Sequence, residues 1–238
     1  MNILITGATS GIGQQLARDY AAAGHHVVAC GRNEQALATL HNEYPEHIAG
    51  QPLDIADADA TQRALSTYTN IDLVILAAGV CEYLDVEHFD AALFQRVFDV
   101  NVIGTMRCVE ALLPQLSKGS TLVLVGSTAR LLPFTRAEAY GASKAAVHYI
   151  AASLRIDLAK RGIEVLHVSP GFVETPMTAQ NDFEMPMQVS VETASKAIRR
   201  GIAKGTFDIT FPRLFGLILK FASRLPQRWQ QAFSRRLS

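Results

Sequence analysis

The alternation of short apolar runs with longer amphipathic stretches constrains the fold of this chain most. Apolar runs occupy residues 2–6, 26–30, 72–77, 121–126 and 164–169, with weaker ones near 47–52 and 207–210. Such runs are typical of strands buried on both faces of a parallel sheet. Helical patterns lie between them, at about 12–23, 33–43, 57–67, 87–116 with a break, 138–161 and 191–204. This order predicts a doubly wound α/β domain with helices on both faces of the sheet.

Composition fits one such domain followed by an extension. The 238 residues are 49% apolar, which is enough for a sizeable core. Basic and acidic side chains balance at 22 each, so charge gives no case for a nucleic-acid-binding protein. The last thirty residues nevertheless contain six basic side chains and no acid. We therefore expect a Rossmann-type α/β domain over 1–208 and a basic amphipathic extension over 209–238.

The cysteines and the longest apolar runs indicate where the protein resides. Cys30, Cys81 and Cys108 are scattered and odd in number, as in a reducing compartment, and no pair suggests a metal site. No run of eighteen apolar residues predicts a membrane-spanning helix, and the N-terminus lacks signal-peptide features. We expect a cytoplasmic protein without a metal. The extension is the one segment that could hold it to the inner face of a membrane.

A glycine-rich turn, TGATSGIG at 6–13, follows the first strand directly. Gly7, Gly11 and Gly13 would permit a tight turn and a close approach of the backbone to a ligand. The next helix would offer its free N–H groups and positive dipole to a pyrophosphate. Its place after the first strand of a βαβ unit predicts a nucleotide site, although turns also use glycine for other reasons.

Tyr140 and Lys144 lie four residues apart in an alanine-rich helix, and so on one helix face. A free tyrosine has a pKa of about 10, too high for efficient acid–base chemistry near neutrality. We expect the ammonium of Lys144 to lower the pKa of Tyr140. The alternative is that Tyr140 packs and Lys144 is solvated.

These motifs, with four further ones in order, make residues 2 to about 204 resemble the short-chain dehydrogenase/reductase family. The further motifs are AAG at 77–79, DVNVIGT with Asn101, VGSTA with Ser127, and SPGFVET with Pro170, Gly171 and Thr175. The resemblance implies a catalytic set of Asn101, Ser127, Tyr140 and Lys144. Tyr140 would exchange a proton with the substrate and Ser127 would orient the reacting oxygen. Lys144 would bind the nicotinamide ribose, and Asn101 would hold a water that links Lys144 to solvent.

The end of the second strand predicts which nicotinamide is bound. Gly31 stands where relatives that use NAD carry Asp, and Arg32 matches an arginine of many relatives that use NADP. A guanidinium suits a 2′-phosphate, so we expect NADP(H), with NAD as the alternative. By resemblance, Asp54 would contact the adenine amino group. The expected cofactor-binding residues are Gly7, Ser10, Gly11, Ile12, Gly13, Arg32, Asp54, Ala78, Gly79, Tyr140, Lys144, Val173 and Thr175.

Apolar residues around the predicted site indicate the kind of substrate. They are Leu131, Leu132 and Phe134 after the catalytic strand, and Met177, Phe183, Met185 and Met187 in the segment that forms a mobile lid in the family. Flexible apolar side chains favour an apolar or amphipathic carbonyl or alcohol. The alternative is that they only pack the lid on the body.

The extension allows two interpretations. Arg213, Lys220 and Arg224 fall on one helical face, apolar residues cover most of the remainder, and Pro226 breaks the helix. Such a helix could lie on an anionic membrane surface, or pack on its own body or a second subunit. By resemblance, pairing through the helices that hold Asn101 and Tyr140 would give a homodimer or homotetramer.

The function that these features predict is an NADP(H)-dependent oxidoreductase acting on a small-molecule carbonyl or secondary alcohol. One rival is a nucleotide-sensing binding protein without turnover, and another is a peripheral membrane adaptor on the same fold. A sensing protein usually lacks part of the catalytic set, whereas all four residues are present here.

Overall fold

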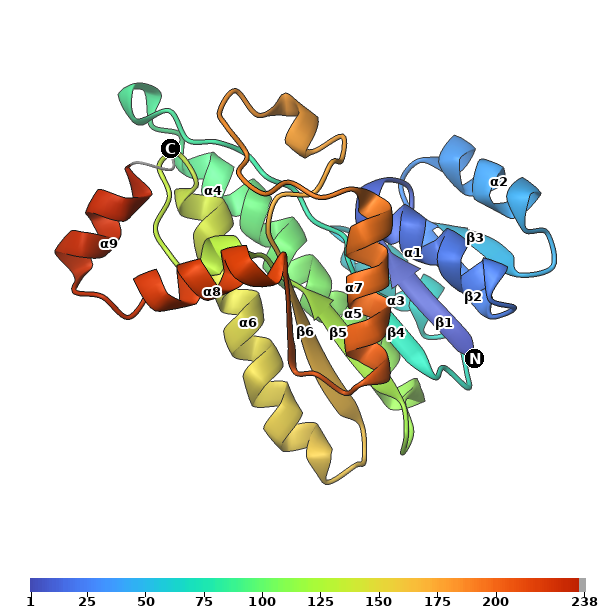
Figure 1. Cartoon of the computed structure of the whole chain (residues 1–238). Helices are drawn as coiled ribbons and strands as arrows, with labels where there is room; N and C mark the ends of the chain where they lie inside the picture. Colours follow the sequence, from blue (N-terminus) through green and yellow to red (C-terminus); the bar gives the residue numbers. More distant parts are fainter. Residues whose placement is uncertain (236–238) are drawn as a thin grey trace.

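Seven parallel strands form one sheet, in a computed structural model that describes residues 1–235 (Figure 1). They lie in the order β3-β2-β1-β4-β5-β6-β7. Their bounds are β1 Asn2–Thr6, β2 His26–Gly31, β3 Ile48–Pro52, β4 Leu73–Leu76, β5 Thr121–Val125, β6 Glu164–Pro170 and β7 Asp208–Phe211. The strand order reverses between β1 and β4, and a crevice forms at the carboxyl ends of strands at such a point.

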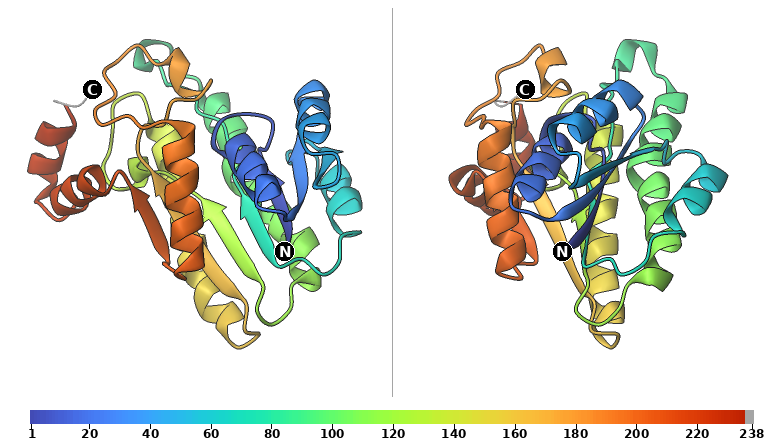
Figure 2. Two further views of the ribbon diagram at one scale, coloured as in Figure 1. Left: turned by 45° about the vertical axis from the view of Figure 1, so that its right-hand side comes forward. Right: turned by 90° about the vertical axis from the view of Figure 1, so that its right-hand side faces the viewer.

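Helices cover both faces of the sheet (Figure 2). One face carries α1 (Gly11–Ala22), α2 (Glu34–Glu43) and α7 (Val191–Ala203). The other carries α3 (Ala58–Leu65), α5 (Thr105–Leu112) and α6 (Glu138–Ala159). The alternation of side chains along each strand explains the two layers: Ile3 and Ile5 pack with the first set of helices, and Leu4 packs with the second. The predicted doubly wound fold is confirmed, including both weak strands.

The predicted break in the long fourth helical region is a change of helix type. α4 (Ala91–Phe98) is followed by a π-helical segment, Asp99–Gly104, and then by α5. Gly104 allows this segment to approach the β3–α3 loop, because a Cβ there would lie 2.8 Å from Ile55 Cγ1. Such π-helical turns often occur at functional sites, and this one contains Asn101.

The C-terminal extension packs on the body through one helix face. β7 runs across the expected boundary at 208/209, so the helical part begins with α8 (Arg213–Ala222) and continues with α9 (Gln227–Ser234). Phe215, Leu219 and Ala222 of α8 are buried against Leu132. Arg236, the sixth basic residue of the extension, lies outside the described residues. Within residues 1–235, no helix is both long and apolar enough to cross a membrane.

Candidate active site

Two adjoining cavities open beside the carboxyl ends of the central strands. The glycine-turn cleft, of about 260 Å³, runs from residues 6–13 past the ends of β2, β4 and β5. The apolar cavity, of about 200 Å³, lies between the segment after β5, the β6–α7 loop and α8. Ser127 and Tyr140 line both cavities, as do Gly171, Met177 and Thr178.

The glycine turn is shaped by close backbone contacts. Gly7 has a φ of +69°, and a Cβ there would lie 2.7 Å from the backbone nitrogen of Ala78. A Cβ on Gly13 would collide with the carbonyl oxygen of Gly7. Neither position can therefore carry a side chain without a shift of the backbone. α1 begins at Gly11, so its first N–H groups face the cleft and suit a pyrophosphate.

The structure brings the predicted cofactor-binding residues together. All thirteen line the glycine-turn cleft: Gly7, Ser10, Gly11, Ile12, Gly13, Arg32, Asp54, Ala78, Gly79, Tyr140, Lys144, Val173 and Thr175. Thr6, Thr9 and Met177 also line it, although the sequence did not single them out for this role. A nicotinamide dinucleotide would be held by this set, with its pyrophosphate at the glycine turn.

The end of the cleft at β2 carries a positive side chain. The Arg32 guanidinium is 70% exposed and lies 3.8 Å from the Asp54 carboxylate. Gly31 faces Thr9 so closely that a Cβ there would lie 2.5 Å from the Thr9 methyl carbon. An aspartate at position 31 would thus displace Thr9, and the charged side chain that the cleft presents beside this position is the cation of Arg32.

Tyr140, Ser127 and Lys144 meet where the two cavities join. α6 places Tyr140 and Lys144 on one face, with Lys144 Nζ 5.7 Å from the centroid of the Tyr140 ring. Ser127 follows β5 by two residues, and its Oγ accepts a hydrogen bond from the Ala129 N–H at 3.1 Å. Lys144 Nζ donates to the Val125 carbonyl at 3.2 Å.

Burial governs the protonation of this pair. It raises the pKa of Tyr140 to about 12, with a further increase from Cys81, against the hydrogen bond with Ser127. It lowers the pKa of Lys144 to about 8. The structure thus differs from the expectation that Lys144 lowers the pKa of Tyr140, because loss of solvent disfavours the charged form of both groups. The phenol of Tyr140 is therefore neutral at neutral pH.

Asn101 lies behind the cleft and does not line it. Its Oδ1 accepts from the Val80 N–H at 2.8 Å, and its Nδ2 donates to the Val80 carbonyl at 2.9 Å and to Ser143 Oγ at 3.0 Å. Gly79 separates it from Lys144: a Cβ on Gly79 would lie 3.1 Å from Asn101 Oδ1 and 3.2 Å from Lys144 Nζ. Asn101 therefore fixes the segment after β4 close to Lys144, and the water expected between them stays a prediction.

Aromatic side chains dominate the apolar cavity. Of the residues expected near the substrate, Phe134, Met177 and Phe183 line it. Leu131 and Leu132 instead pack beneath α8, and neither Met185 nor Met187 lines the cavity. The remaining apolar or aromatic walls, absent from the sequence expectations, are Cys81, Tyr83, Ala129, Ala137, Phe172 and Phe215.

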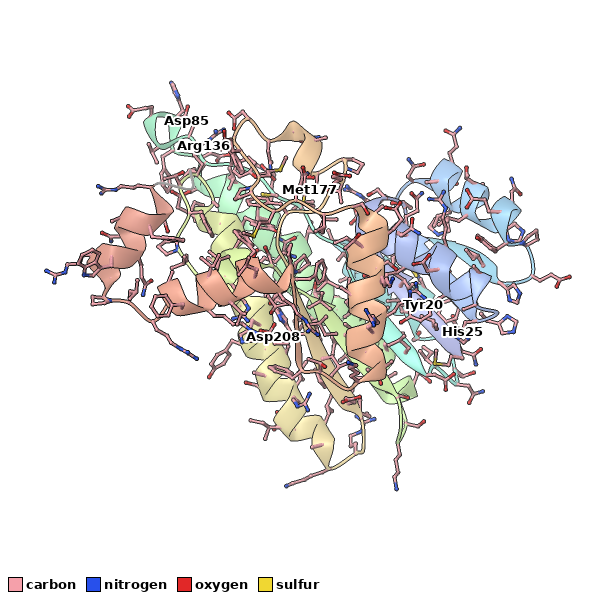
Figure 3. The ribbon with its side chains drawn as sticks, in the orientation of Figure 1. Tyr20, His25, Asp85, Arg136, Met177 and Asp208 are labelled. Carbon is pink, nitrogen blue, oxygen red and sulfur yellow. The ribbon has the colours of Figure 1, made fainter. Side chains whose placement is uncertain are left out.

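The β6–α7 loop is tied over the apolar cavity. Tyr83 donates its hydroxyl hydrogen bond to Asn181 at 2.8 Å, and its ring meets Phe183 edge to face. The Arg136 guanidinium pairs with Asp182 at 3.0 Å and lies over the Tyr83 ring. Arg136 and Met177 are labelled near the upper edge of Figure 3, where this loop crosses the molecule. The segment expected as a lid thus lies against the segments that follow β4 and β5.

Position at strand ends could have revealed some of the missed residues. Cys81 and Tyr83 follow β4 by five and seven residues, and the ends of parallel strands meet at one edge of the sheet. Phe172 follows β6 in the same way. Phe215 has no such signal, since it comes from the extension.

Comparison with known proteins agrees with this geometry. The model of the short chain dehydrogenase family matches residues 1–185. An uncharacterized oxidoreductase of Myxococcus xanthus is 35% identical over 98% of this chain and 96% of its own length. A serine dehydrogenase solved with NADP+ is 25% identical, with a TM-score of 0.78 over 88% of this chain and 93% of its own.

A second solved structure shows the same fold with the other nicotinamide. A short chain dehydrogenase/reductase of Burkholderia phymatum in complex with NAD has a TM-score of 0.83 over 92% of this chain and 91% of its own, at 22% identity. The fold thus accommodates both cofactors. Given the family match over most of its length, this chain belongs to the short chain dehydrogenase family of oxidoreductases.

Proposed function

We propose that this protein is an NADP(H)-dependent oxidoreductase that interconverts a carbonyl and a secondary alcohol on an apolar or amphipathic small molecule. The observation that carries the proposal is that Ser127 and Tyr140 line both cavities. Hydride transfer requires the two reacting carbons in contact, so cofactor and substrate must meet where their sites join. The proton-donating hydroxyl lies at that junction.

The residues at the junction supply the proton and hold the reacting oxygen. A nicotinamide bound in the glycine-turn cleft would supply or accept the hydride. In reduction, Tyr140 gives its phenolic proton to the carbonyl oxygen, which Ser127 orients by a hydrogen bond. In oxidation, Tyr140 takes the proton from the alcohol. A pKa of about 12 keeps Tyr140 protonated at neutral pH, which suits reduction.

The preference for NADP(H) rests on Arg32 and Gly31. The exposed guanidinium of Arg32 can donate two hydrogen bonds to a 2′-phosphate and pair with its negative charge, and Thr9 fills the space of a carboxylate beside Gly31. Lys144 uses one of its three donors on Val125, which leaves donors for the nicotinamide ribose. Asn101 acts through its hold on Val80 rather than by direct contact with the reactants.

The outer surfaces of the helices that hold Asn101 and Tyr140 suit contacts between two or four copies of the chain. Ile103, Tyr149 and Ile156 lie on the π-helical segment and on α6, and all three are exposed. Apolar side chains at these places suit pairing between copies. Light scattering on the full chain would test this, with a monomeric mass as the result against it.

The function is tested by following NADPH oxidation with a panel of apolar ketones and aldehydes, alongside sugars and hydroxy acids. Tyr140→Phe should lower kcat about 10²- to 10⁴-fold and leave NADPH binding intact. Tyr44→Phe, which removes the hydroxyl of a tyrosine that lines neither cavity, is the control and should be neutral. NADPH binding without turnover of any carbonyl would favour the nucleotide-sensing rival, and binding of neither cofactor would favour the adaptor.

A further inference from the structure

The helix α8 has a second apolar face that nothing in residues 1–235 covers. Leu214, Leu217, Ile218 and Phe221 are all exposed, with Leu217 at 66% and Phe221 at 69%. They are spaced three and four residues apart, so they form one stripe along the helix. The opposite face of α8 is the one buried against the body.

Unpaired arginines accompany this stripe. Arg213 begins α8 and Arg224 lies two residues past its end, and both are exposed. α9 adds Arg228 and the neighbouring exposed ring of Trp229. The Arg228 guanidinium lies 5.8 Å from the centroid of that ring. Within the described part of the chain, none of these three arginines forms an ion pair.

Only one basic side chain of the described extension forms an ion pair with the body of the protein. Lys220 points to the body and pairs with Asp208 at 2.8 Å. No acidic residue occurs anywhere in residues 209–235, so the arginines face outward without local neutralisation. The exposed surface of the two helices is therefore apolar and positive at once, at the end of the molecule farthest from α2 (Figure 1).

We propose that α8 and α9 dock this protein on an anionic lipid surface. The stripe of Leu214, Leu217, Ile218 and Phe221 would enter the boundary between head groups and acyl chains, as apolar faces of interfacial helices do. The arginines would lie at the level of the lipid phosphates and bind them. Trp229 has the amphipathic ring that favours this interface.

The size of the surface favours a membrane over a second copy of the chain. A ten-residue helix is about 15 Å long and about 10 Å wide. Even with α9, this footprint is far below the roughly 800 Å² that each partner buries in a stable protein pair. A lipid surface has no such requirement, because binding grows with each inserted side chain and each neutralised charge.

Cosedimentation of the full chain with vesicles tests the proposal without any enzymatic readout. Vesicles of equal parts phosphatidylcholine and phosphatidylglycerol should bind the protein, and pure phosphatidylcholine should bind it much less. Leu217→Glu with Phe221→Glu should weaken binding at least about tenfold, since two inserted side chains are lost. Arg213→Gln with Arg224→Gln should weaken it about tenfold and reduce its dependence on salt.

Val86→Glu is the matched control, because Val86 is similarly exposed but lies outside the extension, and it should bind as the wild type does. Urea unfolding of each variant verifies that it folds. Absence of binding to the anionic vesicles by the wild type overturns the proposal, as does full binding by the Leu217→Glu, Phe221→Glu variant. A dimer that this variant dissociates, without vesicle binding by the wild type, also overturns it and assigns the stripe to a second copy.

Discussion

Lys220 Nζ lies 2.8 Å from a carboxylate oxygen of Asp208, which joins α8 to β7. The same oxygen accepts from the Arg130 guanidinium at 2.9 Å. Arg130 belongs to the short 3-10 helix that Ser127 caps. One carboxylate therefore connects the extension to the segment that holds the proposed catalytic serine. Asp208 lies just below α8 in the view of Figure 3.

Two histidines complete this buried group without making it a metal site. Candidate ligand atoms of His148, His167 and Asp208 lie within 4.8 Å of one another. Arg130 and Lys220 already place two positive charges on the carboxylate, and these would repel a metal ion. Burial lowers the pKa of His148 to about 4, so that ring is neutral. This arrangement of charge argues against a metal ion at these three residues.

Asp208→Asn should destabilise the protein by about 3 kcal/mol, because it leaves the largely buried guanidinium of Arg130 and the partly exposed ammonium of Lys220 without their partner. Burial alone would raise the pKa of Asp208, but its hydrogen-bond donors and the charge of Arg130 outweigh burial and hold it well below 3.8. The ionised carboxylate thus contributes its full stability above about pH 4, and the contribution is lost as the pH falls further. Urea unfolding of both proteins from pH 7 downward measures this: their free energies should converge in acid. A constant difference would contradict the assignment.

Phe215→Ala should raise KM for an apolar substrate about tenfold and change kcat little, because the ring forms a wall of the apolar cavity without reaching the reacting atoms. Steady-state kinetics with the best carbonyl of the panel measures this. Phe221→Ala, six residues on and exposed, is the control and should leave KM unchanged in the absence of lipid. Equal effects of the two substitutions would argue against a cavity wall at Phe215.

Patterns within a few neighbouring residues predicted the sheet and the nucleotide turn. The walls of the apolar cavity depend instead on packing between segments that are distant in the sequence. The roles of Gly7 and Gly13 in the turn could be predicted, because a strand, a turn and a helix follow one another within a few residues. The place of Phe215 in the cavity wall could not be predicted, because only the path of β7 and α8 brings it beside Phe172. A close approach makes that path possible, since a Cβ on Gly216 would collide with Thr210.

The sequence also did not predict how the pKa values of Tyr140 and Lys144 shift. A spacing of four residues correctly places Tyr140 and Lys144 on one helix face, but it does not report burial. Burial disfavours the charged form of each group, and it depends on the segments after β4 and β5 that close around the pair. Prediction from spacing therefore located the pair and misjudged its electrostatics.

Arg32→Ala should weaken NADPH binding roughly 10- to 100-fold and leave NADH binding nearly unchanged, because only the 2′-phosphate would contact the guanidinium. Calorimetric titration with both cofactors measures the change in preference. Arg63→Ala, an exposed arginine on α3, serves as the control for a general loss of positive charge. A parallel loss of NADH and NADPH affinity would place Arg32 outside the phosphate site.

Lys144→Met should abolish turnover and make the protein more stable at pH 7. Burial lowers the pKa of Lys144 from 10.5 to about 8, so the folded state holds the proton less tightly than the unfolded chain. The charged lysine therefore destabilises the fold below about pH 8, and the penalty fades as the pH rises toward 10.5. Removal of the ammonium should add on the order of 2 kcal/mol at pH 7, after allowance for the lost hydrogen bond to Val125.

Urea unfolding at pH 7 and near pH 10.5 separates this effect from a change in packing. The advantage of the methionine variant should shrink at the higher pH, because the lysine of the wild type is then neutral in the folded state and about half neutral in the unfolded chain. Lys160→Met, at the exposed C-terminal end of α6, is the control and should show no such dependence on pH. A variant less stable than the wild type at pH 7 would mean that Lys144 contributes more to the fold through Val125 than its burial costs. The cation would then be a structural element first, and its place beside Tyr140 would need no catalytic explanation.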